Sequence, residues 1–214
     1  MLGSFEQERS IRLEQRANDG KGAKEAFMAC LERSSPSVQA RAQDALITAA
    51  NLEYHHEGIS SRAYLAHTMR VASLVIQLWD PEDGLALRVA LLHNVLELSN
   101  LDQQALNRLA GAEEARIIGL LTVDRPRQKD PEYVRTYYQG LVQAGPAARV
   151  VKCLDKLDNL FIIGLNPDQN VRTRYLAEIE QYVVPMVEHD MAHLVRYFEE
   201  LVEDSRRIGS LTGA

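Results

Sequence analysis

The sequence predicts an all-α protein with a single helical core. Apolar residues recur at intervals of three and four along nearly every segment, and no stretch alternates apolar and polar residues over the length of a strand. The chain has 214 residues, of which 46% are hydrophobic, so it can bury a substantial core within one domain. Two of the most apolar helical segments also carry a narrow polar stripe, which a purely structural helix does not need.

The first 35 residues predict an accessory helical leader. Their apolar pattern is weaker than that of the rest, and a polar break, NDGKG, interrupts it at 18–22. The segment SSPS at 34–37 predicts the start of the next helix, because serine and proline are favoured at the head of a helix. We therefore expect a leader over 1–35 and a helical domain over 36–214, and we expect a chain without the leader to fold.

Six core helices should follow the leader, and then a long C-terminal run that Pro185 should bend or divide. The expected ranges are 38–55, 64–79, 84–99, 102 to about 123, 131–143, 146–163, and 170 to about 207.

Composition limits the partners and the compartment. A formal net charge of −6 and an isoelectric point near 5.6 argue against large nucleic acid, although a local basic patch could still hold a small nucleotide. Cys30 and Cys153 are the only cysteines, with no CxxC and no secretory pattern, so the cytoplasm is the expected compartment. No apolar run approaches the roughly 20 residues that span a bilayer, so no membrane partner is expected. No feature of the sequence predicts an oligomeric state.

The first polar stripe lies in the segment ALLHNVLELSN, at 90–100. His93, Asn94 and Glu97 fall within an arc of about 100° on a helix whose other faces are almost entirely apolar. A helix that is apolar all round belongs in a core, so these three polar side chains indicate a buried site.

The second stripe lies in the segment AARVVKCLDKLDNLFII. Lys152, Asp155, Lys156 and Asn159 are spaced at i, i+3, i+4 and i+7. A solvated face with Lys–Asp pairs is the alternative interpretation of this stripe. His67, in RAYLAHTMRVASLVI, is a third polar group on an apolar helix. Imidazoles and a carboxylate that converge from separate helices are how a helical bundle holds a divalent metal.

Three segments together resemble the HD-domain phosphohydrolases, and most closely the RelA/SpoT-type (p)ppGpp hydrolases, or small alarmone hydrolases. They are YLAHTMRVA, ALLHNVLELS and VVKCLDKLDNL, against family patterns YxxHPxxVA, ALLHDxxED and VKxADRxxN. The resemblance spans roughly residues 45–185 in the family's order. It implies an HD-domain helical bundle that hydrolyses the 3'-diphosphate from guanosine 3',5'-bis(diphosphate), with the help of a divalent metal, usually manganese.

The resemblance also implies roles for individual residues. The implied metal ligands are His67, His93, Asn94 and Asp155. Glu97 is implied as a catalytic residue, the first member of the acidic pair beside the attacking water. The residues that would lie beside the nucleotide are Arg62, Lys152, Lys156 and Asn159.

Three positions depart from the family pattern. Asn94 replaces the aspartate that gives the HD family its name, Leu98 replaces the second acid of the ED pair, and Thr68 replaces a proline. An amide oxygen supplies a dipole where a carboxylate supplies a full charge, so Asn94 should weaken metal binding. The missing acid at Leu98 removes a group that could orient water or accept a proton.

The sequence is therefore compatible with two functions. The first is metal-dependent hydrolysis of a phosphate or diphosphate ester on a nucleotide, weakened by Asn94 and Leu98. The alternative is a catalytically inactive HD-fold nucleotide sensor or helical interaction module. Aromatic and basic side chains in the last third of the chain could contact a ligand or serve packing: Tyr133, Tyr137, Tyr138, Arg172, Arg174 and Tyr175.

Overall fold

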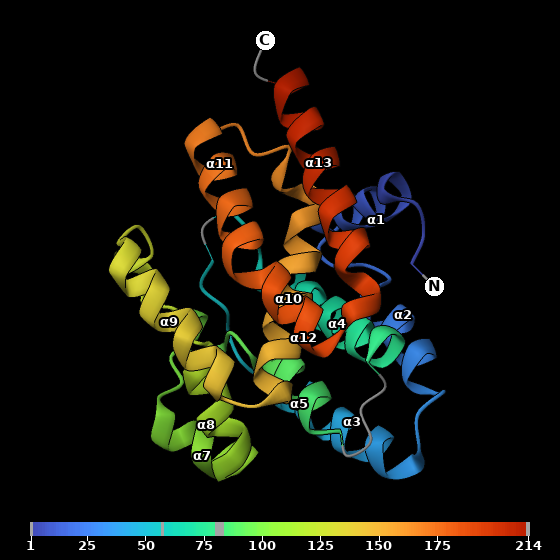
Figure 1. Ribbon diagram of the computed structural model, residues 1–214. Helices are drawn as coiled ribbons and strands as arrows, with labels where there is room; N and C mark the ends of the chain where they lie inside the picture. The colour runs from blue at the N-terminus through green and yellow to red at the C-terminus, as the bar shows by residue number, and fades with distance from the viewer. Residues whose placement is uncertain (1, 57, 80–83, 213–214) are drawn as a thin grey trace.

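The computed structural model describes residues 2–56, 58–79 and 84–212 (Figure 1). Within these ranges every regular secondary-structure element is a helix. The one β-bridge in this part of the chain is an isolated pair, His56 and Ile59. The all-α prediction is confirmed. The outermost residues of the expected leader and domain, 1 and 213–214, and Glu57 in the loop before His67 lie outside the described residues.

Helix α10, Pro146–Ile163, lies at the centre of the molecule (Figure 1). It begins after Gly145, whose φ of +100° suits a residue without a side chain, and Pro146 occupies its first turn. Its side chains are buried on almost every face. The helices that pack most extensively against it are α1 (Phe5–Ala17), α4 (Ser61–Leu78), α5 (Leu85–Leu92), α8 (Ala112–Leu121), α12 (Val184–Asp190) and α13 (Val195–Thr212).

Two helices that support the site begin at serine caps. Helix α3, Pro36–Ala50, starts where SSPS predicted, with the Ser35 side chain accepting the Val38 amide N–H at 3.4 Å. The Ser60 hydroxyl caps α4 in the same way. Helix α4 packs against α5 and α10, so it holds its buried face toward both polar stripes.

The predicted helix over 84–99 is broken at its polar stripe. Helix α5 ends at Leu92, and a short helix, α6, runs from Val95 to Leu98. The ring of His93 hydrogen-bonds to the Ala90 carbonyl at 2.7 Å, and that carbonyl would accept the Asn94 amide N–H in a continuous helix. The break therefore coincides with the residues that the sequence singled out.

Glycine and proline account for further differences from the expected helices. Gly111, with φ +93°, separates α7 (Gln103–Ala110) from α8, where one helix was expected. Helix α11, Gln169–Glu178, is followed by a π-helical turn at Ile179–Val183 and then by Pro185. The changed hydrogen-bond register of this turn accommodates the N–H that proline lacks. The C-terminal run divides later, at Met191, before α13. Helix α9, Pro131–Gln143, has its predicted bounds.

The N-terminal segment forms two helices, α1 and α2 (Ala23–Leu31), that cover the core. Helix α1 contacts α10 and α4, while α2 packs along α4. Phe27 is fully buried and Leu31 is 1% exposed. The division at residue 35 stays a prediction, but the leader contributes side chains to the common core.

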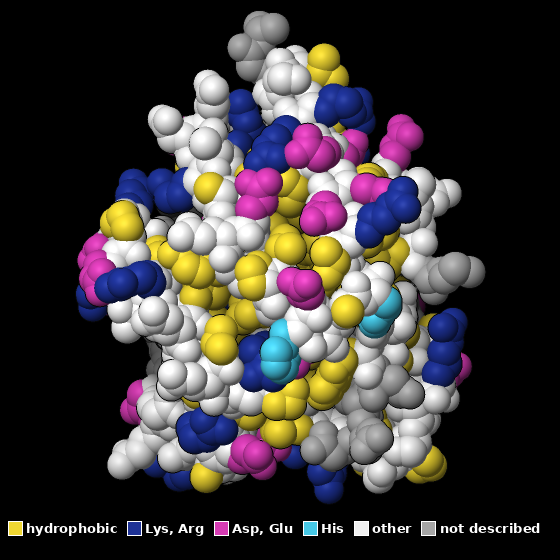
Figure 2. Space-filling view, in the orientation of Figure 1, with side chains coloured by type: hydrophobic (Ala, Val, Ile, Leu, Met, Phe, Trp, Pro, Cys, Tyr) yellow, Lys and Arg dark blue, Asp and Glu magenta, His cyan; other side chains and the backbone are white. Residues whose placement is uncertain are grey.

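Both cysteines, Cys30 and Cys153, are buried and form no disulfide. None of the helices in the described ranges is long and apolar enough to cross a membrane. The face shown in Figure 2 carries acidic and basic side chains interspersed with hydrophobic ones.

Candidate metal centre

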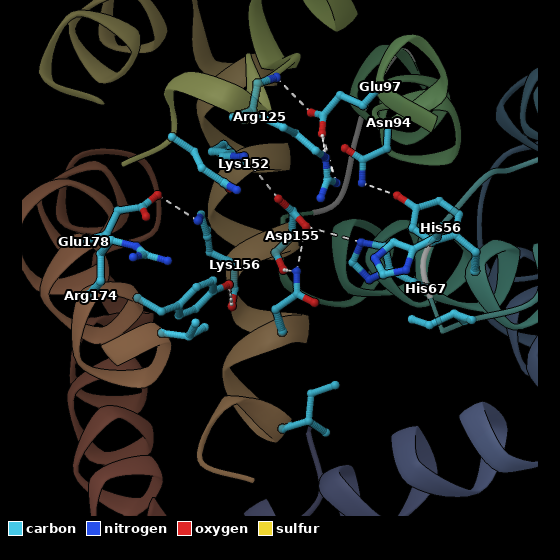
Figure 3. A pocket seen from close by; sticks show the side chains of 18 of the residues that line it. His56, His67, Asn94, Glu97, Arg125, Lys152, Asp155, Lys156, Arg174 and Glu178 are labelled. Carbon is cyan, nitrogen blue, oxygen red and sulfur yellow. Dashed lines mark hydrogen bonds and ion pairs between the residues drawn. The ribbon is translucent and has the colours of Figure 1, made fainter. Parts of the chain in front are cut away.

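Three buried side chains from three helical segments converge on one point. They are His67 of α4, His93 at the end of α5, and Asp155 of α10, and one potential ligand atom from each lies within 4.8 Å of the others. The Nε2 atoms of His67 and His93 lie 3.3 Å and 3.7 Å from Oδ1 of Asp155. The two polar stripes and His67 therefore meet in space (Figure 3).

The contacts of the two Nδ1 atoms leave the Nε2 atom of each ring facing this centre. The Nδ1–H of His93 donates to the Ala90 carbonyl, and its Nε2 is buried without a hydrogen-bond partner among the described residues. Nδ1 of His67 lies 2.8 Å from Oδ2 of Asp158, so with Nδ1–H as donor Nε2 is left facing Asp155. Two imidazole nitrogens and a carboxylate oxygen fit a divalent cation, which would satisfy the unpartnered nitrogen.

A proton would compete with a metal at His67. Burial lowers the pKa of His67, but hydrogen bonds to Asp155 and Asp158 raise it by more, so its net pKa lies above the ordinary value. Binding of a metal at this histidine would therefore displace a proton, and it should weaken as the pH falls.

Asp155 is held in its anionic form. Burial alone raises its pKa, but the charge of Lys152 and the two histidines bring the pKa well below its usual range. The Lys152 Nζ lies 3.3 Å from Oδ2, and the Asn159 amide donates to Oδ1 at 3.0 Å. These neighbours orient a charged oxygen toward the histidines.

Asn94 lines the cavity beside this cluster. Its amide nitrogen donates to the Tyr64 hydroxyl. The side chain then has one atom left for a cation, the amide oxygen, which carries no full charge. Its role as a ligand stays a prediction.

Glu97 also lines the cavity, but both of its oxygens are engaged. Oε1 accepts the Val123 amide N–H at 2.8 Å, and Oε2 accepts from the Arg125 guanidinium at 3.1 Å. Its side chain is 5% exposed. Through these hydrogen bonds Glu97 holds the segment after α8 against the cavity. Leu98, one residue later, is buried in the core and does not line the cavity.

The cluster lies in a cavity of about 580 Å³ whose charge is opposite to that of the whole chain. Eight Lys or Arg side chains line it against three carboxylates, although the chain carries a net charge of −6. Such an arrangement concentrates positive potential in one concave site and favours an anionic ligand. The basic lining residues are Arg12, Arg16, Arg70, Arg125, Lys129, Lys152, Lys156 and Arg174.

Three of the four residues predicted to lie beside a nucleotide line this cavity: Lys152, Lys156 and Asn159. Arg62 does not; its side chain is 84% exposed and pairs with Asp19 at 3.6 Å. Arg62 lies five positions before His67, which places the two side chains about 140° apart around α4. Arg62 therefore lies outside the cavity lining, away from the position predicted for it.

The aromatic and basic residues in the last third of the chain fall into two groups, one that lines the cavity and one that packs elsewhere. The residues of this group that line the cavity are Tyr133, Tyr137, Tyr138, Arg174 and Tyr175. Lys156 lies over the Tyr175 ring, 4.4 Å from its centroid, and its Nζ is 2.7 Å from Glu178. Arg172 turns away and donates to the Gly209 carbonyl of α13 at 3.2 Å, which is a packing role.

The sequence interpretation missed several residues at this site. Asp158 and Arg70 follow Asp155 and His67 by three positions, so helical spacing could have placed them on neighbouring faces. Arg12 comes from α1, and Lys129 from the segment after α8, and no local pattern connects either to the stripes. Only the packing of distant segments brings them in.

Comparison with known proteins finds the likeness in structure. No family model and no curated protein matches the sequence. A solved structure described as a metazoan ortholog of SpoT, which hydrolyzes ppGpp and plays a role in starvation responses, matches with a TM-score of 0.63. The match covers 80% of this chain and 97% of the other at 22% identity. The chain has an HD-domain fold. The HD-domain fold predicted from the three segments is confirmed, and at this identity the likeness is one of fold.

Proposed function

We propose that this chain is an HD-type phosphohydrolase that acts on a nucleotide with a phosphate or diphosphate ester, with guanosine 3',5'-bis(diphosphate) as the first substrate to test. The observation that carries the proposal is the cationic cavity around a His-His-Asp cluster. A ligand with several phosphates would match the excess of basic over acidic side chains in the lining, and the aromatic residues of the cavity could contact a base. The similarity to a ppGpp hydrolase supports the same choice.

We propose His67, His93 and Asp155 as ligands of a divalent metal, manganese being the expected one, with the Asn94 oxygen as a weaker fourth donor. When bound, the metal would polarise a phosphoryl group and activate a water molecule. Lys152 would neutralise negative charge beside Asp155. Lys156 pairs with Glu178, and it would contact the phosphates of a ligand when that ion pair is broken. Asn159 keeps the Asp155 oxygen in place.

A second function, nucleotide sensing without hydrolysis, is favoured by the state of the acidic groups. Glu97 is hydrogen-bonded through both oxygens, and Leu98 cannot accept a proton. With Asn94 tied to Tyr64, no described side chain at this edge of the cavity offers a free carboxylate for water activation. Under this alternative the cavity binds the nucleotide and leaves it intact.

One experiment separates the two functions. Full-length protein purified without chelator is analysed for bound metals and then titrated with manganese. The loaded protein is incubated with guanosine tetraphosphate while nucleotide binding is measured by calorimetry and pyrophosphate release by chromatography. His93→Gln removes a proposed ligand, and His189→Gln is a matched control because His189 is 71% exposed and lies outside the cavity.

Manganese binding and pyrophosphate release that are lost in His93→Gln and kept in His189→Gln would support the hydrolase. Tight nucleotide binding without release would favour the sensor. A protein that binds neither manganese nor the tetraphosphate would overturn both proposals and leave the interaction module.

A further inference from the structure

A second carboxylate of α10, Asp158, stands directly behind the candidate metal centre. It is 1% exposed, and its Oδ2 lies 2.8 Å from Nδ1 of His67. Arg12 of α1 donates to Oδ1 at 2.9 Å, and Arg70 of α4 donates to both oxygens at 2.9–3.2 Å. Helices α1, α4 and α10 therefore meet at this one carboxylate.

We propose that Asp158 is a positioning residue for His67 and that Arg12 makes helix α1 a working part of the metal centre. The inference rests on the proposed metal site. Asp158 accepts the Nδ1–H of His67 and thereby keeps the lone pair of Nε2 on the side of Asp155 and His93. Arg12 and Arg70 hold the carboxylate in the orientation that this hydrogen bond requires.

The geometry favours orientation over simple charge pairing. A histidine that ligates a metal gains a defined tautomer and ring angle when its other nitrogen donates to a carboxylate. A carboxylate with one partner can rotate, but Asp158 is bound from two directions by guanidinium groups whose donors form a rigid fork. Rotation of Asp158 would break several buried, charge-assisted hydrogen bonds at once.

Helix α1 is itself fixed around these contacts. Nη1 of Arg12 donates to the Glu8 carbonyl at 2.7 Å and pairs with the Glu8 carboxylate at 2.8 Å. Its guanidinium lies 4.0 Å from the centroid of the Phe161 ring. Gln15, also on α1, accepts from Arg70 at 2.8 Å. The leader thus supplies two side chains, Arg12 and Gln15, to the network behind His67.

Helix α1 also offers a matched control. Arg9, three residues before Arg12, donates to the Phe161 carbonyl at 2.9 Å and pairs with Asp204 of α13. It holds α1 onto the bundle without touching Asp158, Arg70 or His67. Arg9→Gln therefore removes a docking contact of α1, whereas Arg12→Gln removes a docking contact and a partner of Asp158.

The test compares full-length wild type, Asp158→Asn, Arg12→Gln and Arg9→Gln. The ring nitrogens of His67 are observed by NMR in metal-free protein labelled with 15N-histidine, at alkaline pH, with His67→Gln assigning the signals. Manganese affinity is measured by calorimetry, and folding by thermal unfolding. We expect His67 of the wild type to be protonated at Nδ1, and Asp158→Asn to disturb this tautomer and weaken metal binding about 10- to 100-fold.

Arg12→Gln should change the His67 signals and metal affinity in the same direction but less strongly, because Arg70 remains. Arg9→Gln should lower the melting temperature and leave both readouts at the wild-type values. If Asp158→Asn does not fold, Arg12→Gln decides the proposal against Arg9→Gln.

Wild-type tautomer and affinity in a folded Arg12→Gln would overturn the role of α1, and the same result in Asp158→Asn would overturn the whole inference. An equal loss of affinity in Arg9→Gln would also overturn it, because helix docking alone would then explain the effect. If the wild type binds no manganese, the proposed function fails, while the tautomer of His67 still tests what Asp158 does.

Discussion

The side chains of Asn94 and Tyr64 are joined by a hydrogen bond at the edge of the candidate metal centre, with the Asn94 amide as donor and the Tyr64 hydroxyl as acceptor. Burial raises the pKa of Tyr64 well above its ordinary value, so the hydroxyl keeps its own proton. Because a hydroxyl can reverse its role, Tyr64 could donate to a carboxylate at position 94 as readily as it accepts from an amide.

Asn94→Asp should therefore fold and bind manganese more tightly than the wild type, by about 10-fold or more, because a charged oxygen replaces an amide dipole. Calorimetric titration of the metal measures the change, and Tyr64→Phe is the control that removes the hydroxyl and keeps Asn94. If Asn94→Asp folds normally and gains no affinity for manganese, residue 94 is not a metal ligand. Nucleotide sensing would then be favoured over hydrolysis.

Leu98→Asp should destabilise the protein and fail to rebuild an acidic pair. Leu98 is 6% exposed, packs in the core and does not line the cavity, so a carboxylate there would be buried without a partner. We expect a loss on the order of several kcal/mol in the free energy of unfolding, measured with urea. Leu98→Met should cost far less. A stable Leu98→Asp with faster hydrolysis than the wild type would contradict the expectation.

Removal of residues 1–35 should sharply destabilise the domain. The sequence led us to expect a folded truncation, but the burial of Phe27 and the contacts of Arg12 with Asp158 lead to the opposite expectation. Loss of one buried phenylalanine side chain alone costs about 3 to 5 kcal/mol. Circular dichroism and thermal unfolding of the truncated chain measure the outcome, with Phe27→Leu as a milder comparison. A cooperative transition at the wild-type temperature would restore the original view of the leader.

Asp190 should stabilise the fold at neutral pH and lose that contribution in acid. Burial raises the pKa of Asp190, but hydrogen bonds from Arg149, the shorter at 2.6 Å, bring it below the ordinary value. The stabilisation is therefore complete above the unfolded-state pKa of about 4 and disappears as the pH falls through the lower folded-state pKa. Asp190→Asn should cost about 1 kcal/mol at neutral pH and progressively less in acid.

Urea unfolding over a pH series measures this difference. Glu188 is exposed and lies two positions before Asp190 on the same helix, so Glu188→Gln should leave stability unchanged at every pH. A deficit in Asp190→Asn that stays constant into acid would show that charge pairing with Arg149 is not its cause.

Arg174→Gln should weaken the binding of guanosine tetraphosphate and make it less sensitive to salt. Arg174 is an exposed cation that lines the cavity, so it is placed to attract phosphates while keeping its own hydration. Affinity measured over a range of salt concentrations tests this, and Arg196→Gln is a control because Arg196 is 89% exposed and lies outside the cavity lining. Equal losses in the two variants would indicate a general effect of net charge.

The sequence by itself determined the helical class and the positions of His67, His93 and Asp155 on apolar helices. These are local properties: a period of 3.6 residues places side chains on a face wherever the helix later packs, and an unexplained polar group on an apolar face marks a site. The serine and proline at the start of α3 and the bounds of α9 are readable for the same reason, since the signals lie beside the residues they affect.

The tertiary structure decided which partner each polar group found. Nothing near Glu97 in the sequence indicates that Val123 and Arg125 occupy its oxygens, and nothing near Arg12 indicates Asp158, which lies 146 residues away. The break at His93 likewise coincides with a hydrogen bond from its ring to the Ala90 carbonyl, which the helical period does not predict. Helical period is set by the backbone, whereas the choice of hydrogen-bond partner in a core is set by which distant segments fill the same space.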